Sequence, residues 1–572
     1  MKRDLRKLSD KTYDLLVIGG GIYGACIAWD ASLRGLSVAL VEKGDFGSAT
    51  SANSLKIIHG GLRYLQHGDV RRMRQSIAER KALMRIAPHL IHPLPVVLPS
   101  YGHGLKGPEV LSCALKVNDL IGLDRNWGLS DPQKHIPPGK VLSMRDCLNL
   151  IPGIPRDGLT GGVLFYDAQV YNSERLVLAF LQSAVEQNAD VANYAEVTGF
   201  CQMGDRIVGA TVSDRLSEDS FDIRARLTIN ASGPWINRVL GLLNGRSNSA
   251  NTCFAKAINV VVRPLFSHQY AVGISGRETY HDQDTLLDKG SRFFFMAPWR
   301  GKTLLGTDYL PYEGGPEGFR VTQNDIDAFL KKFNQAYPAA NLKIADVSFV
   351  QGGLLPSSGL CSTTGSVQLT KSYQLHNHQR DGFKGLLSVT GVKYTTARGV
   401  AQHVVDQAFQ ILDKPGVRST SSTHPLYGGQ IDGFTTSLQT AQHTGSSRLS
   451  EASIRRLLYN YGSSYLQVLS CLDNDLINSH RPIEDLAVLR AEVRYGVREE
   501  MAQKLSDVVL RRGELGTAEV PDDSRLSACA ETMGAELGWS LSTMQSELEE
   551  MKTFFEYRVP VQSVSMNSSV GG

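Results

Sequence analysis

Short apolar runs and helix-period segments alternate at the start of the chain. Residues 13–18 form a largely apolar run, which is typical of a parallel strand buried on both faces. Glycines crowd positions 19–24, helical composition extends over 22–34, and a second short apolar run covers 37–41. This order of strand, turn, helix and strand predicts the first βαβ unit of a doubly wound sheet.

The pattern changes several times along the rest of the chain. Residues 190–232 and 254–310 alternate between apolar and polar positions, which indicates β-strands, whereas the proline- and glycine-rich stretch 91–160 is expected to be irregular. Helix-period repeats over 450–556 predict a separate helical domain. We therefore expect an α/β fold in which a Rossmann-type domain carries an inserted α+β domain with an antiparallel sheet, followed by a C-terminal helical domain.

Composition narrows the class of protein. The 572 residues, 42% of them hydrophobic, are too many for one ordinary domain and enough to bury a large core. A net charge of +3 demands no polyanion, so no nucleic-acid partner is expected. The eight cysteines show no CxxC or metal-ligand spacing, so neither a disulfide framework nor a metal site is expected. The charged N-terminus, together with the lack of any run of about 18 apolar residues, predicts a cytoplasmic protein without a membrane-spanning helix.

The glycine-rich turn matches the GxGxxG pattern of dinucleotide-binding sites. Gly19 would form the tight turn, Gly21 would let the backbone approach a pyrophosphate, and Gly24 would let helix and strand pack closely. Glu42 ends the second predicted strand, 18 positions after Gly24, where its carboxylate can accept hydrogen bonds from a ribose. The pattern predicts dinucleotide binding and disfavours NADP, whose 2′-phosphate Glu42 would repel. It leaves NAD and FAD open.

Motifs further along the chain resemble one family. They are Ser48-Ala49-Thr50-Ser51, the His-Gly-Gly block 56–65, the segments 230–235 and 298–308, and the block 391–396. With a helical segment at 492–512, they resemble the FAD-dependent glycerol-3-phosphate dehydrogenases of the respiratory, quinone-linked type, from about residue 13 to about residue 550. The resemblance implies FAD as the cofactor and a glutathione-reductase-like FAD-binding domain.

The resemblance also implies a division of the chain and a set of site residues. FAD-binding segments would cover 1–90, 161–250 and 381–415, with a cap at 91–160, a substrate-binding β-sheet domain at 251–380, the helical domain at 425–556 and a flexible tail at 557–572. Cofactor contacts would come from Gly19, Gly21, Gly24, Glu42, Ser48, Thr50, Ser51, Gly60, Gly61, Ser232, Gly233, Thr395 and Thr396. Substrate contacts would come from Arg63, Tyr64, Asn259, Lys371 and Lys393.

Catalysis would involve His59 and Lys393. A neutral imidazole titrates near working pH, so His59 is the candidate proton acceptor, and a structural histidine in a glycine-rich turn is the alternative. Thr395 and Thr396 are expected to open a helix, where hydroxyl groups commonly cap the first turn.

The resemblance implies a reaction on a small phosphorylated polyol. The family oxidises sn-glycerol 3-phosphate to dihydroxyacetone phosphate by hydride transfer to flavin N5 and passes the electrons to quinone. Three positions depart from its pattern: Asn259 stands where a histidine is usual, and Leu354 and Lys371 stand where arginines are usual. A flavin oxidase or dehydrogenase of a related hydroxylated molecule, using O₂ or another acceptor, is therefore the alternative, and a non-enzymatic FAD-binding paralogue is a third interpretation.

Quinone as acceptor implies a membrane nearby, at the cytoplasmic face of the inner membrane. Basic residues precede a run of apolar ones: Arg71, Arg72, Arg74, Arg80, Lys81 and Arg85, then Ile91, Leu94, Val96, Val97, Leu98, Leu111, Leu115 and Ile121. This order fits either a peripheral patch that faces anionic lipids or a buried core beside a solvated basic helix. The oligomeric state is open, with a homodimer as one option.

Overall fold

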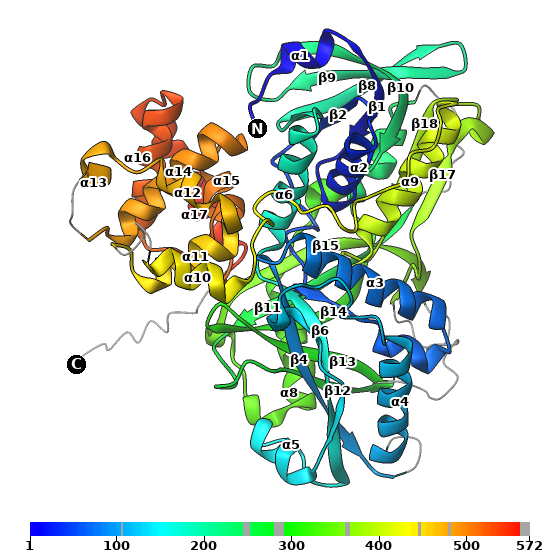
Figure 1. Cartoon of the computed structure of the whole chain (residues 1–572), viewed down its shortest axis with the longest axis vertical. Helices are drawn as coiled ribbons and strands as arrows, with labels where there is room; N and C mark the ends of the chain where they lie inside the picture. The colour runs from blue at the N-terminus through cyan, green and yellow to red at the C-terminus, as the bar shows by residue number, and fades with distance from the viewer. Residues whose placement is uncertain are drawn as a thin grey trace, which may run out of the picture.

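The structure is a computed structural model that describes residues 1–103, 107–243, 252–279, 291–360, 367–443, 448–478 and 482–560. Its two large sheets lie one above the other in Figure 1, and a group of helices lies to one side of them. The flexible tail expected at 557–572 lies outside the described residues from position 561 onward.

The upper sheet is the doubly wound one. Among the described residues it has eight strands, with β17-β18-β10-β1-β2-β7 as its main path; β9 pairs with β10, and β8 pairs with β9. The strands are β1 (Thr12–Ile18), β2 (Val38–Val41), β7 (Asp190–Ala192), β8 (Ala195–Met203), β9 (Arg206–Asp214), β10 (Ser220–Asn230), β17 (Gln374–Asn377) and β18 (Leu386–Thr390). β1 runs parallel to β2 and β10, which puts the turn after β1 at the carboxyl edge where such sheets bind ligands.

Three helices pack around this sheet because their sequences are apolar over most of their length. They are α2 (Ile22–Leu33), α6 (Ser173–Glu186) and α9 (Ala397–Ile411). Trp29 of α2 is fully buried and meets Phe180 of α6 edge to face at 5.3 Å between ring centroids. The predicted strand, turn, helix and strand at the N-terminus are thus confirmed.

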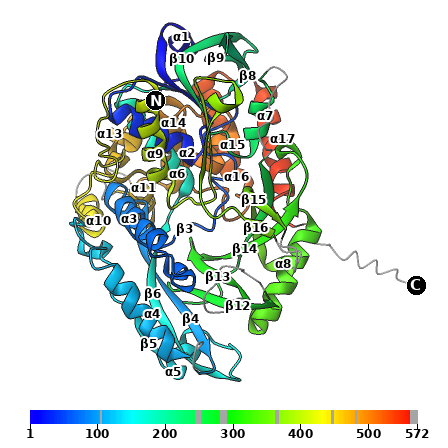
Figure 2. The same cartoon turned by 90° about the vertical axis from the view of Figure 1, so that its right-hand side faces the viewer.

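The lower sheet is largely antiparallel and has ten strands among the described residues. They are β3 (Ile57–Ile58), β4 (Ile91–Tyr101), β5 (Lys140–Leu142), β6 (Leu159–Val170), β11 (Cys253–Val262), β12 (Ala271–Thr279), β13 (Ser291–Trp299), β14 (Lys302–Tyr312), β15 (Val347–Leu360) and β16 (Val367–Leu369). The helices α3 (Val70–Ile86) and α4 (Pro108–Ile121) lie on one side of this sheet and α8 (Gln323–Ala336) on the other (Figure 2).

The stretch 91–160 is not irregular, so this expectation is wrong. It contains β4, α4 and α5 (Met144–Leu150), and β4 pairs with β6 over its whole length despite three prolines. The prolines are at positions 93, 95 and 99, all on one side of the strand's two-residue repeat, so the residues between them keep their N–H groups for pairing. Residues 161–170 also belong to the lower sheet and not to a cofactor segment, because they form most of β6.

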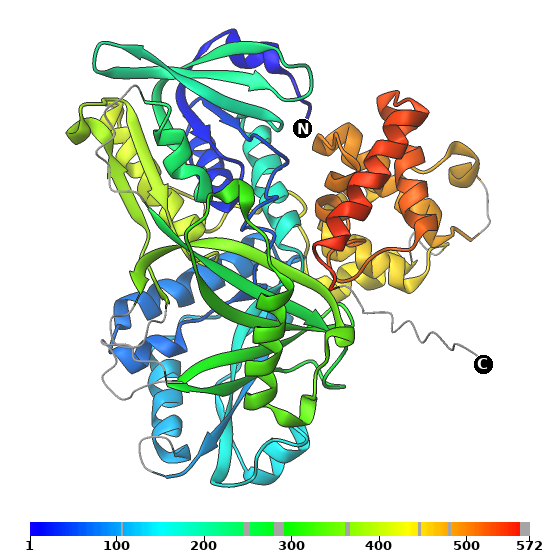
Figure 3. The ribbon, with the colours of Figure 1, turned by 180° about the vertical axis from the view of Figure 1, so that it is seen from behind.

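The C-terminal helices form the group that Figure 3 shows beside both sheets. They are α10 (Phe434–His443), α11 (Glu451–Tyr461), α12 (Tyr465–Leu469), α13 (Asn474–Asn478), α14 (Asp485–Glu500), α15 (Leu505–Asp507), α16 (Asp523–Leu537) and α17 (Leu541–Glu556), with the π-helical turn η10 (Val508–Arg512). Buried ion pairs join this group to the cofactor domain: Arg175 of α6 meets Glu500 at 2.6 Å, and Asp45 meets Arg511 and Arg512.

Candidate functional site

The glycine turn after β1 has no room for side chains. A Cβ at Gly24 would lie 1.9 Å from the Gly19 carbonyl oxygen, and one at Gly19 would lie 2.7 Å from the Ala231 carbonyl oxygen. Gly19 also has φ of +109°, which a residue with a side chain rarely adopts. The chain therefore presents bare backbone at the start of α2, and this cradle fits a pyrophosphate.

Side chains from the next loop close the cradle. Glu42, at the end of β2, accepts hydrogen bonds from the amides of Gly20 at 2.7 Å and Gly44 at 2.9 Å. Burial raises the pKa of Glu42, and these two amide bonds oppose that rise. Ser51 Oγ accepts from the Ile22 amide at 3.0 Å, and Thr50 Oγ1 donates to the Leu354 carbonyl at 3.0 Å, whereas Ser48 is exposed.

The second cofactor segment meets the cradle from β10. The Ala231 amide donates to the Ile18 carbonyl at 2.9 Å, so the turn after β10 lies against the turn after β1. Ser232 Oγ donates to Asn230 Oδ1 at 2.6 Å, and Gly233 begins the short turn η4 (Gly233–Trp235) with φ of +56°. The predicted cofactor residues of both segments therefore lie at the same edge of the upper sheet.

His59 forms a dyad with a residue 108 positions away. Its Nδ1 lies 3.0 Å from Asp167 Oδ2, and the Gly60 amide donates to the other oxygen of Asp167 at 2.6 Å. Burial alone would raise the pKa of Asp167, but the hydrogen bond from His59 and the charge of Arg80 hold it below its ordinary value. An ionised Asp167 favours a proton on Nδ1 of the imidazole, which leaves Nε2 with its lone pair.

Lys393 and Tyr64 form the second pair. Lys393 Nζ donates to the Tyr64 hydroxyl and lies 3.3 Å from the Lys371 carbonyl oxygen. Tyr64 lies in the turn η1 (Leu62–His67), which Gly61 opens with φ of +88°. The predicted residue Arg63 is in the same turn, but its side chain lies outside the described part of the structure.

The loop that carries Lys393 also meets the His59 loop. The His59 amide donates to Thr395 Oγ1 at 3.2 Å. Five predicted site residues therefore gather where β18 ends: His59, Tyr64, Lys371, Lys393 and Thr395. The helix α9 begins at Ala397 with Thr396 as its N-cap, as predicted, but the Thr396 hydroxyl makes no capping hydrogen bond. The expectation of a hydroxyl cap is therefore wrong for Thr396, and the Thr395 hydroxyl accepts from the His59 amide.

The three positions that depart from the family pattern are not alike. Asn259 is 2% exposed, and its Oδ1 accepts from Thr307 Oγ1 at 2.7 Å, so protein groups already engage its carboxamide. Leu354 is buried in β15 and brings no charge to this side of the sheet. Lys371 is exposed, and its backbone accepts the hydrogen bond from Lys393, so two lysines are neighbours beside Tyr64.

Sequence patterns missed Asp167 and its support. Arg80 donates to the Tyr166 carbonyl and lies 3.4 Å from Asp167, although the sequence suggests only a basic helix. Lys56 is fully buried against both carboxylate oxygens of Glu174 at 3.0 Å, which anchors the strand that leads to His59. Nothing in the spacing of these residues signals their contacts, since each pair is more than 80 positions apart.

Of the two alternatives for the apolar run 91–121, buried core is the correct one for most of it. Ile91, Val96 and Val97 are fully buried in β4, because helices cover both faces of the lower sheet. Val96 shares a buried cluster with Leu115 of α4, and Val97 shares one with Phe329 of α8. The exposed apolar residues lie slightly later, at the end of α4 and in the turn that follows: Leu120, Leu123 and Trp127 are 66%, 69% and 73% exposed. Among the residues that the structure describes, no helix has both the length and the apolar character needed to cross a bilayer.

Comparisons with known proteins agree with this arrangement. The family model for FAD dependent oxidoreductases matches residues 14–407, and the model for the C-terminal domain of alpha-glycerophosphate oxidase matches residues 419–544. A glycerol-3-phosphate dehydrogenase of Synechocystis is 30% identical over 97% of this chain and 98% of its own length. The mitochondrial glycerol-3-phosphate dehydrogenase of Mus musculus is 30% identical over 96% of this chain and 74% of its own length.

A solved structure extends the similarity to three dimensions. The glycerol-3-phosphate dehydrogenase of Bacillus halodurans, solved as a complex with FAD, has a TM-score of 0.74 and 26% identity, with 97% of this chain and 96% of that chain covered. Its fold and its cofactor agree with the glycine cradle described above. The chain therefore belongs to the FAD-dependent oxidoreductases, in the glycerol-3-phosphate dehydrogenase family.

Proposed function

We propose that this protein oxidises the secondary alcohol of sn-glycerol 3-phosphate to dihydroxyacetone phosphate. The observation that carries the proposal is the meeting of the His59–Asp167 dyad with the Lys393–Tyr64 pair through the bond between His59 and Thr395. A proton acceptor and a cation thus stand at one place, beside the end of β18. FAD, when bound in the glycine cradle, supplies the acceptor for the hydride that leaves the carbon.

His59 is the proposed acceptor of the hydroxyl proton. Asp167 holds Nδ1 of the imidazole in its protonated form, so that Nε2 is the basic nitrogen. The side chain of His59 is half exposed while that of Asp167 is buried, which is the arrangement expected if one group meets the substrate and the other orients it. Asp167 is thus a positioning residue.

Lys393 and Lys371 are the proposed partners of the phosphate, together with Arg63. The Tyr64 hydroxyl restrains the Lys393 ammonium, whose charge lies 4.7 Å from the centre of the tyrosine ring. An ammonium group binds phosphate as a point charge and without the fixed fork of an arginine. Leu354 and Lys371 should therefore make phosphate binding weaker than in relatives with two arginines, without abolishing it.

Anaerobic reduction of the flavin tests the proposal. The purified yellow holoenzyme is mixed with sn-glycerol 3-phosphate without oxygen, and the visible absorbance of the flavin is followed. Rapid bleaching is expected, and much slower bleaching with glycerol, which lacks the phosphate. If sn-glycerol 3-phosphate leaves the flavin oxidised while dithionite reduces it, the substrate assignment fails and other alcohols and acids must be screened. Hydrogen peroxide release on aerobic turnover would favour the oxidase alternative.

We propose further that the electrons pass to quinone at a membrane surface. Leu120, Leu123 and Trp127 form an exposed apolar patch, and a tryptophan at such a position suits the headgroup region of a bilayer. Arg85 is exposed on α3, and its guanidinium lies beside Gly128, 3.1 Å from the position that a Cβ of that residue would take. A positive charge therefore lies beside the patch.

Vesicle binding tests the membrane proposal. The holoenzyme should sediment with vesicles of anionic phosphatidylglycerol, and Trp127→Ser with Leu123→Ser should release it into the supernatant. The control Val417→Ser removes an exposed apolar side chain elsewhere and should leave binding unchanged. If the variant with Trp127→Ser and Leu123→Ser sediments with the vesicles as well as Val417→Ser does, the proposal is contradicted.

A further inference from the structure

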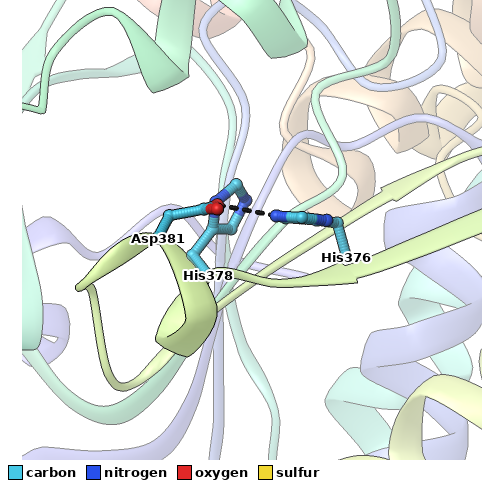
Figure 4. A group of neighbouring side chains, drawn as sticks. All are labelled: His376, His378 and Asp381. Atoms are coloured by element: carbon cyan, nitrogen blue, oxygen red, sulfur yellow. Dashed lines mark hydrogen bonds and ion pairs between the residues drawn. The ribbon is translucent and has the colours of Figure 1, made fainter. Parts of the chain in front are cut away.

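Two histidines and an aspartate converge at the far end of the β17–β18 hairpin. His376 is on β17, and His378 and Asp381 lie in the short turn η8 (His378–Asp381) that follows it. Asp381 Oδ2 lies 2.6 Å from His376 Nε2 and 2.8 Å from His378 Nδ1, and the side chains point toward one another (Figure 4). The three candidate ligand atoms all lie within 4.8 Å of each other.

We propose that His376, His378 and Asp381 bind one divalent transition-metal ion of the Zn²⁺ class. Two imidazole nitrogens and one carboxylate are a common set of three protein ligands for zinc, with a fourth position left to solvent. Imidazole ligands favour zinc, cobalt and nickel over magnesium and calcium, which prefer oxygen. The site uses none of the residues that the proposed function assigns to cofactor or substrate.

The geometry needs only a small adjustment to accept the ion. Ligand atoms around tetrahedral zinc are roughly 3.3 Å apart, given metal–ligand distances of about 2.0–2.2 Å. The two nitrogen–oxygen distances here are 2.6 and 2.8 Å, so they must open by about 0.7 and about 0.5 Å. The His376 side chain is 49% exposed and can make most of that movement, whereas His378 is held inside the fold.

A second contact orients His378 as metal ligands usually are. Its Nε2 lies 2.8 Å from Ser388 Oγ on β18, a buried hydroxyl. A hydroxyl can donate or accept, so Ser388 Oγ can accept a hydrogen bond from Nε2–H when Nδ1 turns its lone pair to a metal.

The position of the cluster gives the metal a structural effect. β17 pairs with β18 from Gln374 opposite Thr390 to Asn377 opposite Leu387. Lys371 and Lys393 lie beyond the first of these pairs, and the cluster lies at the opposite end of the same hairpin. A bound ion would tie the turn η8 to the strand and stabilise the hairpin, without contact to the residues that meet the substrate.

Cobalt spectroscopy on the holoenzyme tests the proposal. Co²⁺ in a site of nitrogen and oxygen ligands absorbs at wavelengths longer than the flavin bands, so titration with CoCl₂ should give bands that saturate at one equivalent. Added ZnSO₄ should remove these bands. The variants His376→Gln and Asp381→Asn should each weaken Co²⁺ binding at least tenfold, and His403→Gln, which changes an exposed histidine on the neighbouring helix α9, should not weaken it.

A fold control keeps the test decisive. Each variant should retain its flavin absorbance and its melting temperature without metal, since His376 is half exposed and the carboxamide introduced by Asp381→Asn has the shape of the carboxylate. With Zn²⁺ present, the melting temperature should rise for the unchanged protein and for His403→Gln only. No saturable Co²⁺ bands, or bands that persist in His376→Gln and Asp381→Asn, would overturn the proposal.

Discussion

The cofactor cradle and the substrate face are built in different ways. The cradle comes mainly from one continuous segment, in which the turn 19–24 and Glu42 lie within a single βαβ unit. The substrate face is assembled from loops that are far apart in sequence: His59 meets Asp167 over 108 positions, and Lys393 meets Tyr64 over 329. The first is thus fixed by local backbone geometry, and the second depends on how the two sheets dock.

This difference should separate two kinds of defect. A side chain added in the cradle would overlap backbone atoms, so that folding and FAD binding should fail together. A change on the substrate face removes one side chain from a preformed site, so that FAD should stay bound while turnover falls.

The largest effect is expected for Gly24→Ala. The added Cβ would lie 1.9 Å from the Gly19 carbonyl oxygen, a backbone atom that cannot move aside. We expect the ratio of flavin to protein absorbance to fall at least tenfold, or the protein to be insoluble. Gly416→Ala, where no heavy atom of the described residues lies within 4 Å of an added Cβ, should keep its flavin, and a yellow, stable Gly24→Ala enzyme would contradict this prediction.

The next effect is expected for His59→Gln. Loss of a positioned general base typically slows a reaction about 10²–10⁴-fold. Stopped-flow reduction of the flavin by sn-glycerol 3-phosphate should slow by that amount while the flavin content stays normal. His403→Gln serves as the control. A rate within threefold of the unchanged enzyme would remove His59 from its proposed role.

Asp45 is the point where the cradle depends on distant residues. It lies in the loop after Glu42, buried, and pairs with Arg511 and Arg512 of the C-terminal helices. Removal of one partner from a buried ion pair typically costs about 3–5 kcal/mol. Asp45→Asn should therefore lower the melting temperature strongly, whereas Asp205→Asn, which breaks the exposed pair with Lys384, should leave it nearly unchanged because solvent screens that pair.

The same pair predicts a dependence of stability on acid. Burial would raise the pKa of Asp45, but the charges of Arg512 and Arg511 outweigh it and lower the pKa to about 2. An aspartate in the unfolded chain has a pKa of about 3.9, so the pair contributes stability above that pH and loses it as pH falls toward the folded value. The acid-induced loss of the free energy of unfolding between these values should be smaller in Asp45→Asn. If the free energy of unfolding falls with acid to the same extent in Asp45→Asn, Asp45 is not the source of this pH dependence.

The smallest effect is expected for Lys393→Met. A hydrogen bond to a charged group is typically worth about 1.5–3 kcal/mol, so the Kd of sn-glycerol 3-phosphate should rise about tenfold or more. Glycerol, without a phosphate, should bind no worse than before. Lys384→Met is the matched surface control, and Lys393→Arg should restore part of the affinity. An equal loss for glycerol and sn-glycerol 3-phosphate would argue against a phosphate contact.

The sequence predicts the local parts of this molecule and misses the remote ones. The strand, turn and helix around Gly19 and Gly24 follow from local rules, because only glycine fits the backbone conformation at Gly19 and the close packing at Gly24. The prolines of the stretch 91–160 predict irregular structure, but β4 forms there because it pairs with β6, more than 50 positions away. Asp167 has no motif of its own, since its role arises only when β6 brings it under the His59 loop.

The most direct test of the account is a double-variant cycle on His59 and Asp167, read as the rate of anaerobic flavin reduction by sn-glycerol 3-phosphate. If Asp167 acts only by orienting the His59 imidazole, Asp167→Asn should slow flavin reduction when His59 is present. The same change should cause no further slowing in the His59→Gln background. We expect the flavin of the double variant to be reduced within threefold of the rate of His59→Gln. Effects that multiply, with all variants still holding FAD, would contradict the dyad and show that the two residues work separately.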